Sequence, residues 1–454
     1  MRILGALLIT LIITAHLAAQ DQHRAVAERL KDQALTDMAS YEMLKELTST
    51  AGHRLSGSVG YEKAVRWAQQ RLTDAGADSV WTEPVMVPHW ERGPIEKAFA
   101  RSGKRTVELT VCALGGSVGT EKNGVTGRVI EVRSFEEVRA LGEKARGAII
   151  FFNRPFDRTR VNTGEAYGGA VNQRSSGAIE AAKVGAAGVL VRSMTNAIDD
   201  EPHTGMMRYD PAVPKIPAAA VSTLDADALS AMIRGGSDIT VTLRLSARSF
   251  PDVLSSNVIA EIRGSEHPDQ IVLVGGHLDA WDKGTGAHDD GSGVAQSIQV
   301  IRLMKKLGLR PKRTIRVVLF ANEENGLKGA LAYAAREQNT RERHIAAIES
   351  DAGGFMPRGF GVTADSASFA RLSRYAALLE VAGAGRVTAG GGGADIGPLK
   401  PFGTALIGLS PESQRYFDYH HSNHDTIDKV HPRELELGAV AMAILAWAIA
   451  EDGL

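Results

Sequence analysis

The sequence predicts an α/β protein with a mostly parallel sheet and a smaller inserted domain. From about residue 255, apolar runs of strand length alternate with stretches of helical periodicity. This alternation is typical of a parallel sheet with helices on both faces, the three-layer α/β/α arrangement. The length of 454 residues exceeds one ordinary core and indicates two domains.

The first element along the chain has the pattern of a signal peptide, over residues 1–19. Arg2 supplies a positive start, residues 3–13 are almost wholly apolar, and Ala18 and Ala19 offer a small-residue cleavage site. An uncleaved membrane anchor is the alternative, but the apolar run is short for a membrane span. We therefore expect a secreted or periplasmic protein without stable membrane insertion after cleavage.

The next segments predict one domain interrupted by another. Residues 20–107 begin with helical periodicity and become irregular, whereas residues 251–454 carry the regular alternation. Residues 108–250 differ from both, because short β-rich runs with helical stretches between them occur at 127–132, 147–152 and 187–192. We expect the two outer segments to form one domain and residues 108–250 to form a small α/β insert.

The last 200 or so residues divide into strands and helices in turn. Four apolar runs predict strands at residues 271–276, 314–321, 344–350 and 404–409. Helical spacing and start signals, including a proline at the first turn of the last helix, predict helices at residues 291–307, 326–336, 366–381 and 432–450.

Composition narrows the class of function. The chain has 52 basic and 53 acidic residues, a formal net charge of -1, which gives no support for nucleic-acid binding. Cys112 is the only cysteine. An intramolecular disulfide and a zinc site made of several thiolates are therefore both excluded.

Histidine and acidic residues follow the predicted strands or lie in loops between elements. They fall in five segments, which are GGHLDAW with His277 and Asp279, HDDGSG with Asp289, NEENG with Glu323 and Glu324, ESDAGG with Asp351, and HHSNHDT with His420 and His421. Ligands of open α/β sheets bind beyond the carboxyl ends of the strands. These segments can therefore meet in one crevice.

Imidazole and carboxylate groups without thiolates suit zinc, with cobalt or manganese as substitutes. Two histidines and three carboxylates can hold two metal ions about 3.5–4 Å apart when one carboxylate bridges them. We expect His277 and Asp351 to bind one zinc ion. We expect Glu324 and His421 to bind the other, with Asp289 shared between the two.

Glu323 is not among the predicted metal ligands, but it directly precedes one of them, Glu324. A carboxylate placed over a metal-bridging water can act as the general base and pass the proton to the leaving amine. Asp279, two residues after His277, is expected to accept the other N–H of that imidazole. Taken alone, each segment has a plain structural explanation, such as a helix cap for DDGSG. Their joint occurrence favours the metal site, with His288 and His424 less favoured as ligands.

The five segments resemble those of the co-catalytic zinc aminopeptidases and carboxypeptidases. In that family the last histidine ligand precedes Ser or Thr, two variable residues and Asp-Thr, a pattern that residues 421–426 fit. LSGS at 55–58 and PHWERG at 88–93 resemble the carboxypeptidase Q, or plasma glutamate carboxypeptidase, subgroup. The resemblance implies a carboxypeptidase-like fold, substrates that are dipeptides or short peptides with a free N-terminus, and a homodimer. It also implies that residues 108–250 form a protease-associated-like domain.

Two features near the expected site allow more than one interpretation. Many relatives have a tyrosine before the last histidine ligand as an oxyanion donor. Here, as in the favoured subgroup, His420 stands there, either to donate to the oxyanion or only to pack. The glycine run at 389–395 is either a flexible loop or a substrate wall. We favour the wall, in which Gly392 lies close to the peptide and Asp395 pairs with its free ammonium.

These observations favour a zinc-dependent exopeptidase, acting as a dipeptidase or aminopeptidase. The alternatives are a non-catalytic binding protein on the same fold, an aminopeptidase for longer peptides, and a metal-dependent amidohydrolase or cyclotransferase. The complete ligand set and Glu323 argue against the binding protein. Amino-directed and carboxy-directed cleavage both remain open.

Overall fold

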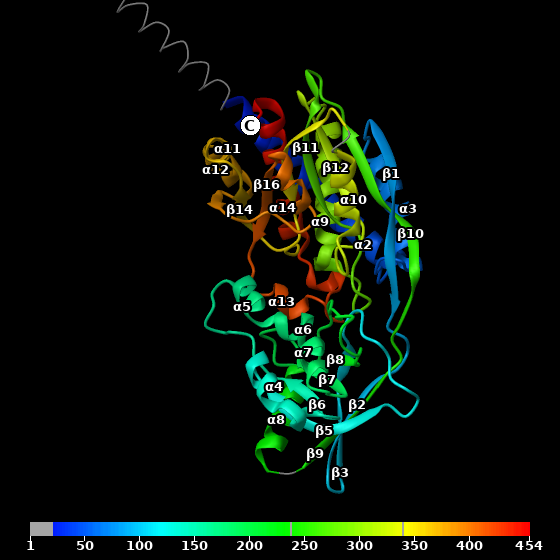
Figure 1. Cartoon of the computed structure of the whole chain (residues 1–454). Coiled ribbons are helices and arrows are strands. Elements are labelled where there is room, and N and C mark those ends of the chain that lie inside the picture. Colours follow the sequence, from blue (N-terminus) through cyan, green and yellow to red (C-terminus); the bar gives the residue numbers. More distant parts are fainter. Residues whose placement is uncertain (1–20, 237, 338–339) are drawn as a thin grey trace, which may run out of the picture.

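A computed structural model describes residues 21–236, 238–337 and 340–454 (Figure 1). The signal peptide expected at residues 1–19 lies outside these described residues. The described chain forms two eight-stranded sheets, each accompanied by its own helices. In Figure 1 the first sheet occupies the upper part of the molecule and the second sheet the lower part.

The first sheet has the strand order β1-β10-β12-β11-β13-β16-β14-β15. Its four central strands pair in parallel and correspond to the four predicted strands; they are β12 (Arg313–Phe320), β11 (His267–His277), β13 (Arg343–Glu349) and β16 (Ala405–Pro411). The flanks add antiparallel pairs through β1 (Ser79–Glu91), β10 (Arg248–Ile262) and β14 (Pro357–Thr363), with β15 (Arg386–Ala389) parallel to β14. The prediction of an α/β fold with a mostly parallel sheet is confirmed.

Helices cover both faces of this sheet. One face packs against residues 21–37, which are helical, and against α2 (Ala39–Thr50), α3 (Val59–Asp74), α9 (Ser292–Lys306) and α14 (Pro432–Asp452). The other face packs against α10 (Lys328–Glu337) and η4 (Gly397–Phe402). Along β12, Val317 and Leu319 face the first group, and Val318 and Phe320 face the second. A strand that is buried on both faces has an unbroken run of apolar residues, which explains why this strand could be predicted from the sequence.

Two elements differ from the sequence expectations. The helix expected at residues 366–381 is divided into α11 (Ser366–Ser373), which Asp365 caps, and α12 (Ala376–Leu379). The segment after residue 78 was read as irregular, but it holds the long strand β1. That strand pairs with β10 from Ser79 to Glu91, with a shift of register between Val87 and His89. Its pattern was missed because polar residues, two prolines and apolar residues are mixed along a partly exposed edge.

The second sheet has the order β3-β2-β9-β5-β6-β7-β8-β4. Its strands are β2 (Glu96–Ser102), β3 (Arg105–Leu109), β4 (Val111–Ala113), β5 (Val125–Val132), β6 (Ile149–Phe152), β7 (Gly188–Arg192), β8 (Ala218–Val221) and β9 (Ile239–Leu245). β2 precedes residue 108, the expected start of the insert, and β3 spans that residue, so the boundary at 107 and 108 falls within a strand. β2 belongs here because it pairs along its whole length with β9.

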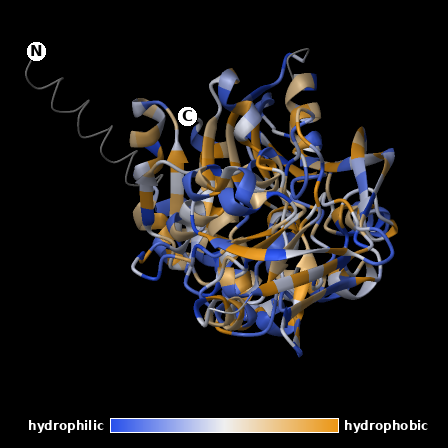
Figure 2. Ribbon diagram, turned by 60° about the horizontal axis from the view of Figure 1, so that its bottom comes forward, coloured by the Kyte–Doolittle hydropathy of each residue, from blue (hydrophilic) through white to orange (hydrophobic). Residues whose placement is uncertain are grey.

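Helices of the second sheet include α4 (Phe135–Leu141), α5 (Thr163–Ala170), α6 (Asn172–Ser175), α7 (Gly177–Lys183) and α8 (Thr223–Arg234). Figure 2 shows apolar residues concentrated in strands and in the helices beside them, while many loops are polar. Within the described ranges, no helix combines the length and the apolar character that a membrane crossing requires.

Candidate metal centre

The predicted metal ligands converge between the two sheets. His277 is the last residue of β11, and Glu324 and Asp351 follow β12 and β13. Asp289 lies in η2 (Ala287–Gly291), and His421 follows the short helix α13 (Tyr416–Tyr419). In Figure 1, α13 lies where the first sheet faces the second domain. The carboxyl ends of the parallel strands therefore bring the expected segments together, as in other open α/β sheets.

The two oxygens of Asp289 face two separate groups. Asp289 Oδ1 lies 3.3 Å from His277 Nε2, which lies 3.5 Å from Asp351 Oδ1. Asp289 Oδ2 lies 3.1 Å from His421 Nε2, which lies 3.0 Å from Glu324 Oε2. The shortest contacts thus pair His277 with Asp351 and His421 with Glu324 around Asp289, although ligand atoms of His277, Asp289 and Glu324 also lie within 4.8 Å of one another.

The separations between these atoms fit a metal centre. Ligand atoms held tetrahedrally at zinc–nitrogen and zinc–oxygen bond lengths lie about 3.3 Å from one another. The four contacts span 3.0–3.5 Å. In addition, Nε2 of His277 and Oδ2 of Asp289 are buried and lack a hydrogen-bond partner in the described part of the chain. Such atoms need a partner, and a cation coordinated by both sets would provide it.

Electrostatics in the cluster also favour a cation. Burial and the nearby Asp289 carboxylate raise the pKa of Glu324 to about 7. Burial opposes the charged form of His421, but Glu324 and Asp289 outweigh burial and raise the pKa of this imidazole to about 10. A proton on His421 would therefore balance part of the negative charge of the clustered carboxylates. Metal ions bind deprotonated ligands, so they would take over this role from the proton.

Asp425 holds the bridging residue in place. Its Oδ1 accepts the backbone N–H of His288 at 2.6 Å, and its Oδ2 accepts the backbone N–H of Asp289 at 3.1 Å. Burial raises the pKa of Asp425 to about 7. The neighbouring Asp290 is also near His277, but both of its oxygens accept backbone N–H groups, from His277 and Gly293. Asp290 is therefore engaged with the backbone and is a poorer ligand than Asp289.

Asp279 differs in detail from the sequence expectation. His277 Nδ1 lies 3.0 Å from the backbone carbonyl of Asp279 and 3.7 Å from its carboxylate, so the carbonyl is the acceptor. The carboxylate instead accepts the backbone N–H groups of Glu323 and Glu324, at 3.0 and 3.2 Å. Asp279 thus fixes the imidazole through its main chain and positions the predicted base and one predicted ligand through its side chain.

The second domain contacts the other nitrogen of His421. Nδ1 of His421 lies 3.4 Å from the carbonyl of Thr204 and 3.5 Å from Nη1 of Arg174. His421 has a left-handed backbone with φ 61°. Sequence reasoning missed Arg174, in the short helix α6, and Thr204, in a loop, because both lie more than 200 residues before His421 and belong to no recognisable motif.

Arg54 is a second residue that sequence reasoning missed. Its guanidinium is fully buried and donates to the carbonyls of Leu278, Thr285 and Gly286, at 2.7, 2.6 and 2.9 Å. These carbonyls bracket the loop that leads from His277 to Asp289. Arg54 directly precedes the LSGS segment. That segment was recognised in the sequence, but it did not indicate what Arg54 contacts.

The three remaining histidines of the region differ in position. His420 stacks on His421, with ring centroids 3.5 Å apart, and its Nε2 lies 3.5 Å from Asp289 Oδ2. His288 stacks between Phe355 and Tyr419, and its Nδ1 accepts the backbone N–H of Gly354. The side chain of His424 is 45% exposed and points to Asp199, at 3.8 Å. Of the three, only His420 reaches the cluster.

Glu323 lies near two buried acidic residues, Asp395 and Glu349. It remains partly exposed, but desolvation by the surrounding protein raises its pKa well above the ordinary range. Asp395 is only 1% exposed, and neither of its oxygens has a hydrogen-bond partner among the described residues. Burial and the neighbouring Glu349 raise the pKa of Asp395 well above its usual value. Glu349, which sequence reasoning did not single out, likewise has one buried oxygen without a partner in that part of the chain.

The glycine run beside Asp395 is packed at Gly392 and exposed at Gly390 and Gly391. Gly390, Gly391 and Gly392 have φ values of 86°, 110° and 128°, which side chains rarely adopt. The carbonyl of Gly392 lies against Gly408 of β16, where a Cβ atom on Gly408 would come within 2.1 Å of it. Gly392 is therefore held against the sheet, as the substrate-wall interpretation requires.

Fold and site together define a metallopeptidase-like hydrolase, with imidazole and carboxylate ligands beyond the strands of an α/β/α sheet. Residues 257–448 match the model of peptidase family M28. Carboxypeptidase Q of Bos taurus and that of Homo sapiens are each 39% identical to this chain over 412 residues, covering 91% of it and 85% of each relative. The chain belongs to peptidase family M28.

Solved structures agree with this assignment. A peptidase M28 precursor from Shewanella amazonensis SB2B is 37% identical, with a TM-score of 0.91, and the match covers 96% of this chain and 98% of that one. A zinc aminopeptidase from Bacillus subtilis, 21% identical with a TM-score of 0.66, shares the fold over 92% of this chain and 96% of its own. The family and fold predicted from the sequence are confirmed, as is the enzyme class, a zinc-dependent exopeptidase.

Proposed function

We propose that this protein hydrolyses dipeptides or short peptides with a free N-terminus, using two zinc ions and Glu323 as the general base. One observation carries the proposal. The two oxygens of Asp289 face separate groups, His277 with Asp351 and His421 with Glu324. A carboxylate presented in this way suits two ions that share one ligand, whereas a site for a single ion needs no second set.

In this proposal His277 and Asp351 would hold one ion, and Glu324 and His421 would hold the other. Asp289 would be a ligand of both ions. When bound, the ions would acidify water towards a pKa of about 7 and polarise the scissile carbonyl. Glu323 would accept a proton from the attacking water and return it to the leaving amine. Its backbone N–H donates to Asp279, which positions the residue beside the cluster. Burial and the charge of His421 hold the pKa of His420 well below its usual range, so a neutral His420 can donate one N–H to the oxyanion.

A groove beside Asp351 supports a short substrate. It has a volume of about 630 Å³, and its lining includes Tyr416 and the two cationic side chains Arg358 and Arg386. The cations suit the carboxylate end of a short peptide. The oxygens of Asp395 and Glu349 that lack hydrogen-bond donors among the described residues suit the ammonium end. We therefore favour the dipeptidase over an aminopeptidase that acts on longer peptides.

The general base is tested by Glu323→Gln. The amide keeps the shape of the side chain but accepts no proton, so turnover should fall at least 100-fold. Elemental analysis should still find two zinc ions per chain, because Glu323 is not among the proposed ligands. In His421→Ala, by contrast, the metal content should fall. Full activity of Glu323→Gln would exclude it as the base, and two ions in His421→Ala would redirect the ligand assignment to His420 or His424.

The substrate class is tested with a dipeptide and its N-acetylated and C-amidated forms. Blocking either end should reduce kcat/KM at least tenfold in the zinc-loaded protein. Asp395→Asn should raise KM for the free dipeptide and have little effect on the N-acetylated form. Equal rates on all three forms would exclude the dipeptidase. Absence of any hydrolysis by the zinc-loaded protein would instead favour a binding protein.

We propose further that the chain is exported, as residues 1–19 predict, and that it forms a homodimer. We also keep the proposal that the second domain is of the protease-associated type. Export is tested by the N-terminal sequence of the mature protein, and the homodimer by its mass in solution from light scattering. The type of the second domain is tested by solving the structure of that domain by itself.

A further inference from the structure

A cationic crevice lies in the second domain, apart from the metal centre. It has a volume of about 730 Å³ and opens at the carboxyl ends of the parallel strands β5, β6 and β7. Figure 1 shows the loop between β6 and α5 projecting at this side of the domain. Carboxyl ends of parallel strands are where α/β sheets bind ligands. The crevice therefore occupies the position of a binding site in its own sheet.

The floor of the crevice is built from buried polar side chains. Arg192, at the end of β7, is 8% exposed, and Asn153, just after β6, is 5% exposed. Nη1 of Arg192 donates to Oδ1 of Asn153 at 3.3 Å and to Oδ1 of Asp227 at 2.6 Å. Asn153 in turn donates to Glu131 at 2.7 Å. A buried, connected network of this kind holds its members in fixed positions.

Positive charge exceeds negative charge around this floor. The lining carries six arginines against three acidic residues; the arginines are Arg133, Arg154, Arg158, Arg160, Arg192 and Arg234, and the acids are Asp157, Glu165 and Asp227. Arg192 and Arg160 pair with these acids. The side chains of Arg133 and Arg158 form no ion pair with any described residue. Two or more guanidinium groups are therefore free to bind an anion.

Arg154 supplies an independent sign of a missing partner. Its guanidinium contacts the carbonyl of Ala170 and the side-chain amide of Asn172, both of which are neutral. Its Nε is buried and has no hydrogen-bond partner among the residues that the structure describes. A buried donor without an acceptor is costly, and an oxyanion in the crevice would provide the acceptor.

We propose that this crevice binds a multiply charged oxyanion, namely the phosphate or sulfate group of a larger ligand. Guanidinium groups bind such oxyanions through paired hydrogen bonds. The volume exceeds what one phosphate ion fills, which leaves room for the group that carries it. The site is separate from the metal centre and does not depend on the proposed peptidase reaction.

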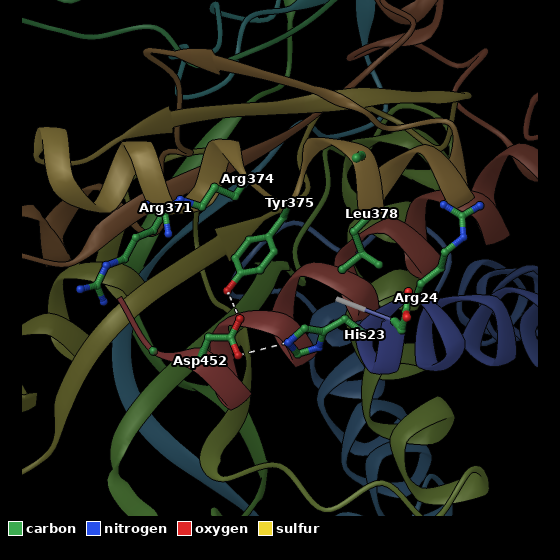
Figure 3. Close-up of a pocket in the computed structure, with 10 residues that line it drawn as sticks. His23, Arg24, Arg371, Arg374, Tyr375, Leu378 and Asp452 are labelled. Carbon is green, nitrogen blue, oxygen red and sulfur yellow. Dashed lines mark hydrogen bonds and ion pairs between the residues drawn. The ribbon is translucent and has the colours of Figure 1, made fainter. Parts of the chain in front are cut away.

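A second cavity, of about 590 Å³, carries no comparable inference. It lies at the end of α14, about 30 Å along that helix from its start near the metal centre. Figure 3 shows Tyr375 and His23 both directed at Asp452, which occupies its interior. Its interior is thus occupied by contacts within the chain.

Titration calorimetry with inorganic phosphate tests the proposal on the zinc-loaded protein at constant ionic strength. Phosphate that binds the metal centre will inhibit dipeptide hydrolysis, so inhibition identifies that binding separately. We expect a further binding event without inhibition. The double variant Arg133→Gln, Arg158→Gln should weaken it at least tenfold and leave hydrolysis unchanged, because both side chains are exposed and lie outside the metal centre. Arg154→Gln is a second variant with the same expected effect.

The matched control is Arg105→Gln, which removes an equally exposed arginine from β3 and should leave phosphate binding unchanged. Sedimentation with vesicles distinguishes the sources of the anion. Binding to phosphatidylglycerol vesicles that needs Arg133 and Arg158 would identify a lipid headgroup, and phosphate binding without vesicle binding would identify a soluble ligand. The proposal is wrong if no non-inhibitory phosphate binding occurs, or if the double variant binds phosphate as the wild type does.

Discussion

Replacing Asp425 by Asn tests how the bridging ligand is held. The Asp425 carboxylate accepts two backbone N–H groups, from His288 at 2.6 Å and from Asp289 at 3.1 Å. An asparagine of the same shape has one oxygen and one NH₂ group, so it can accept only one of these donors. The other N–H would then face a second donor in a buried site. The substitution therefore disturbs the backbone of Asp289 without touching any proposed ligand.

The expected loss of stability follows from these two hydrogen bonds. A hydrogen bond to a charged group contributes about 1.5–3 kcal/mol, and an unpaired buried donor costs about 1–3 kcal/mol. One contact is lost and the other becomes neutral. We therefore expect the free energy of unfolding to fall by about 2–4 kcal/mol. Loss of a group that orients a metal ligand typically reduces metal affinity or activity by about 10- to 100-fold, and we expect kcat/KM to fall within that range.

Three measurements on the purified variant check this reasoning: urea unfolding, zinc affinity by competition with a chelating dye, and kcat/KM on a dipeptide. Asp428→Asn is the matched control. It makes the same chemical change three residues later, at an exposed carboxylate whose contacts are Thr426 and Lys429. Its unfolding, zinc affinity and activity should remain close to wild type. If Asp425→Asn retains wild-type zinc affinity and a kcat/KM within twofold, Asp425 does not position Asp289.

Three other perturbations have expected outcomes. Removing zinc with a chelator should lower the melting temperature and added zinc should restore it, because ions bind only the folded arrangement of ligands; equal melting with and without chelator would contradict a bound metal. Burial lowers the pKa of His344 to about 3. Below pH 6.5 the unfolded state therefore binds a proton at this residue that the folded state does not bind. The free energy of unfolding falls as the pH falls. Between pH 7 and pH 5 this costs about 2 kcal/mol. His344→Gln should remove that part of the pH dependence in urea unfolding, and an unchanged pH dependence would refute the assignment. Arg54→Lys keeps the charge but not the fork that reaches three carbonyls, so it should lower the free energy of unfolding by about 1–3 kcal/mol, and wild-type stability would show that charge alone suffices.

The central strands and helices were predictable because burial leaves a clear pattern. β11, β12, β13 and β16 lie between two helical layers, so each reads as a short apolar run. The edge strand β1 and its neighbour β10 were not predictable in the same way, because much of each is exposed and mixes polar with apolar residues. The start of the second domain was misplaced for a related reason. β2 alternates partly buried, exposed and buried residues and gives no sign of which sheet it joins.

The candidate ligands were accessible to sequence reasoning because few residue types bind zinc and because each lies just beyond a predicted element. The contacts that orient those ligands follow no such rule. Asp279 was singled out, but its carboxylate accepts main-chain N–H groups of Glu323 and Glu324, and its carbonyl accepts from His277. A main-chain carbonyl exists at every residue, so no sequence pattern reports which one is used.

The position of His421 shows why the second domain bears on the metal centre at all. Every proposed ligand comes from the first domain, yet Nδ1 of His421 lies against the Thr204 carbonyl and Arg174 of the second. His203 of the same domain also contacts the carbonyl of His420, with its Nδ1 2.7 Å away. The partner of one ring nitrogen determines which tautomer the other presents to a metal. The insert therefore helps to fix the orientation of the two consecutive histidines, and a ligand set read from the first domain alone would lack the contacts that direct His421 to its ion.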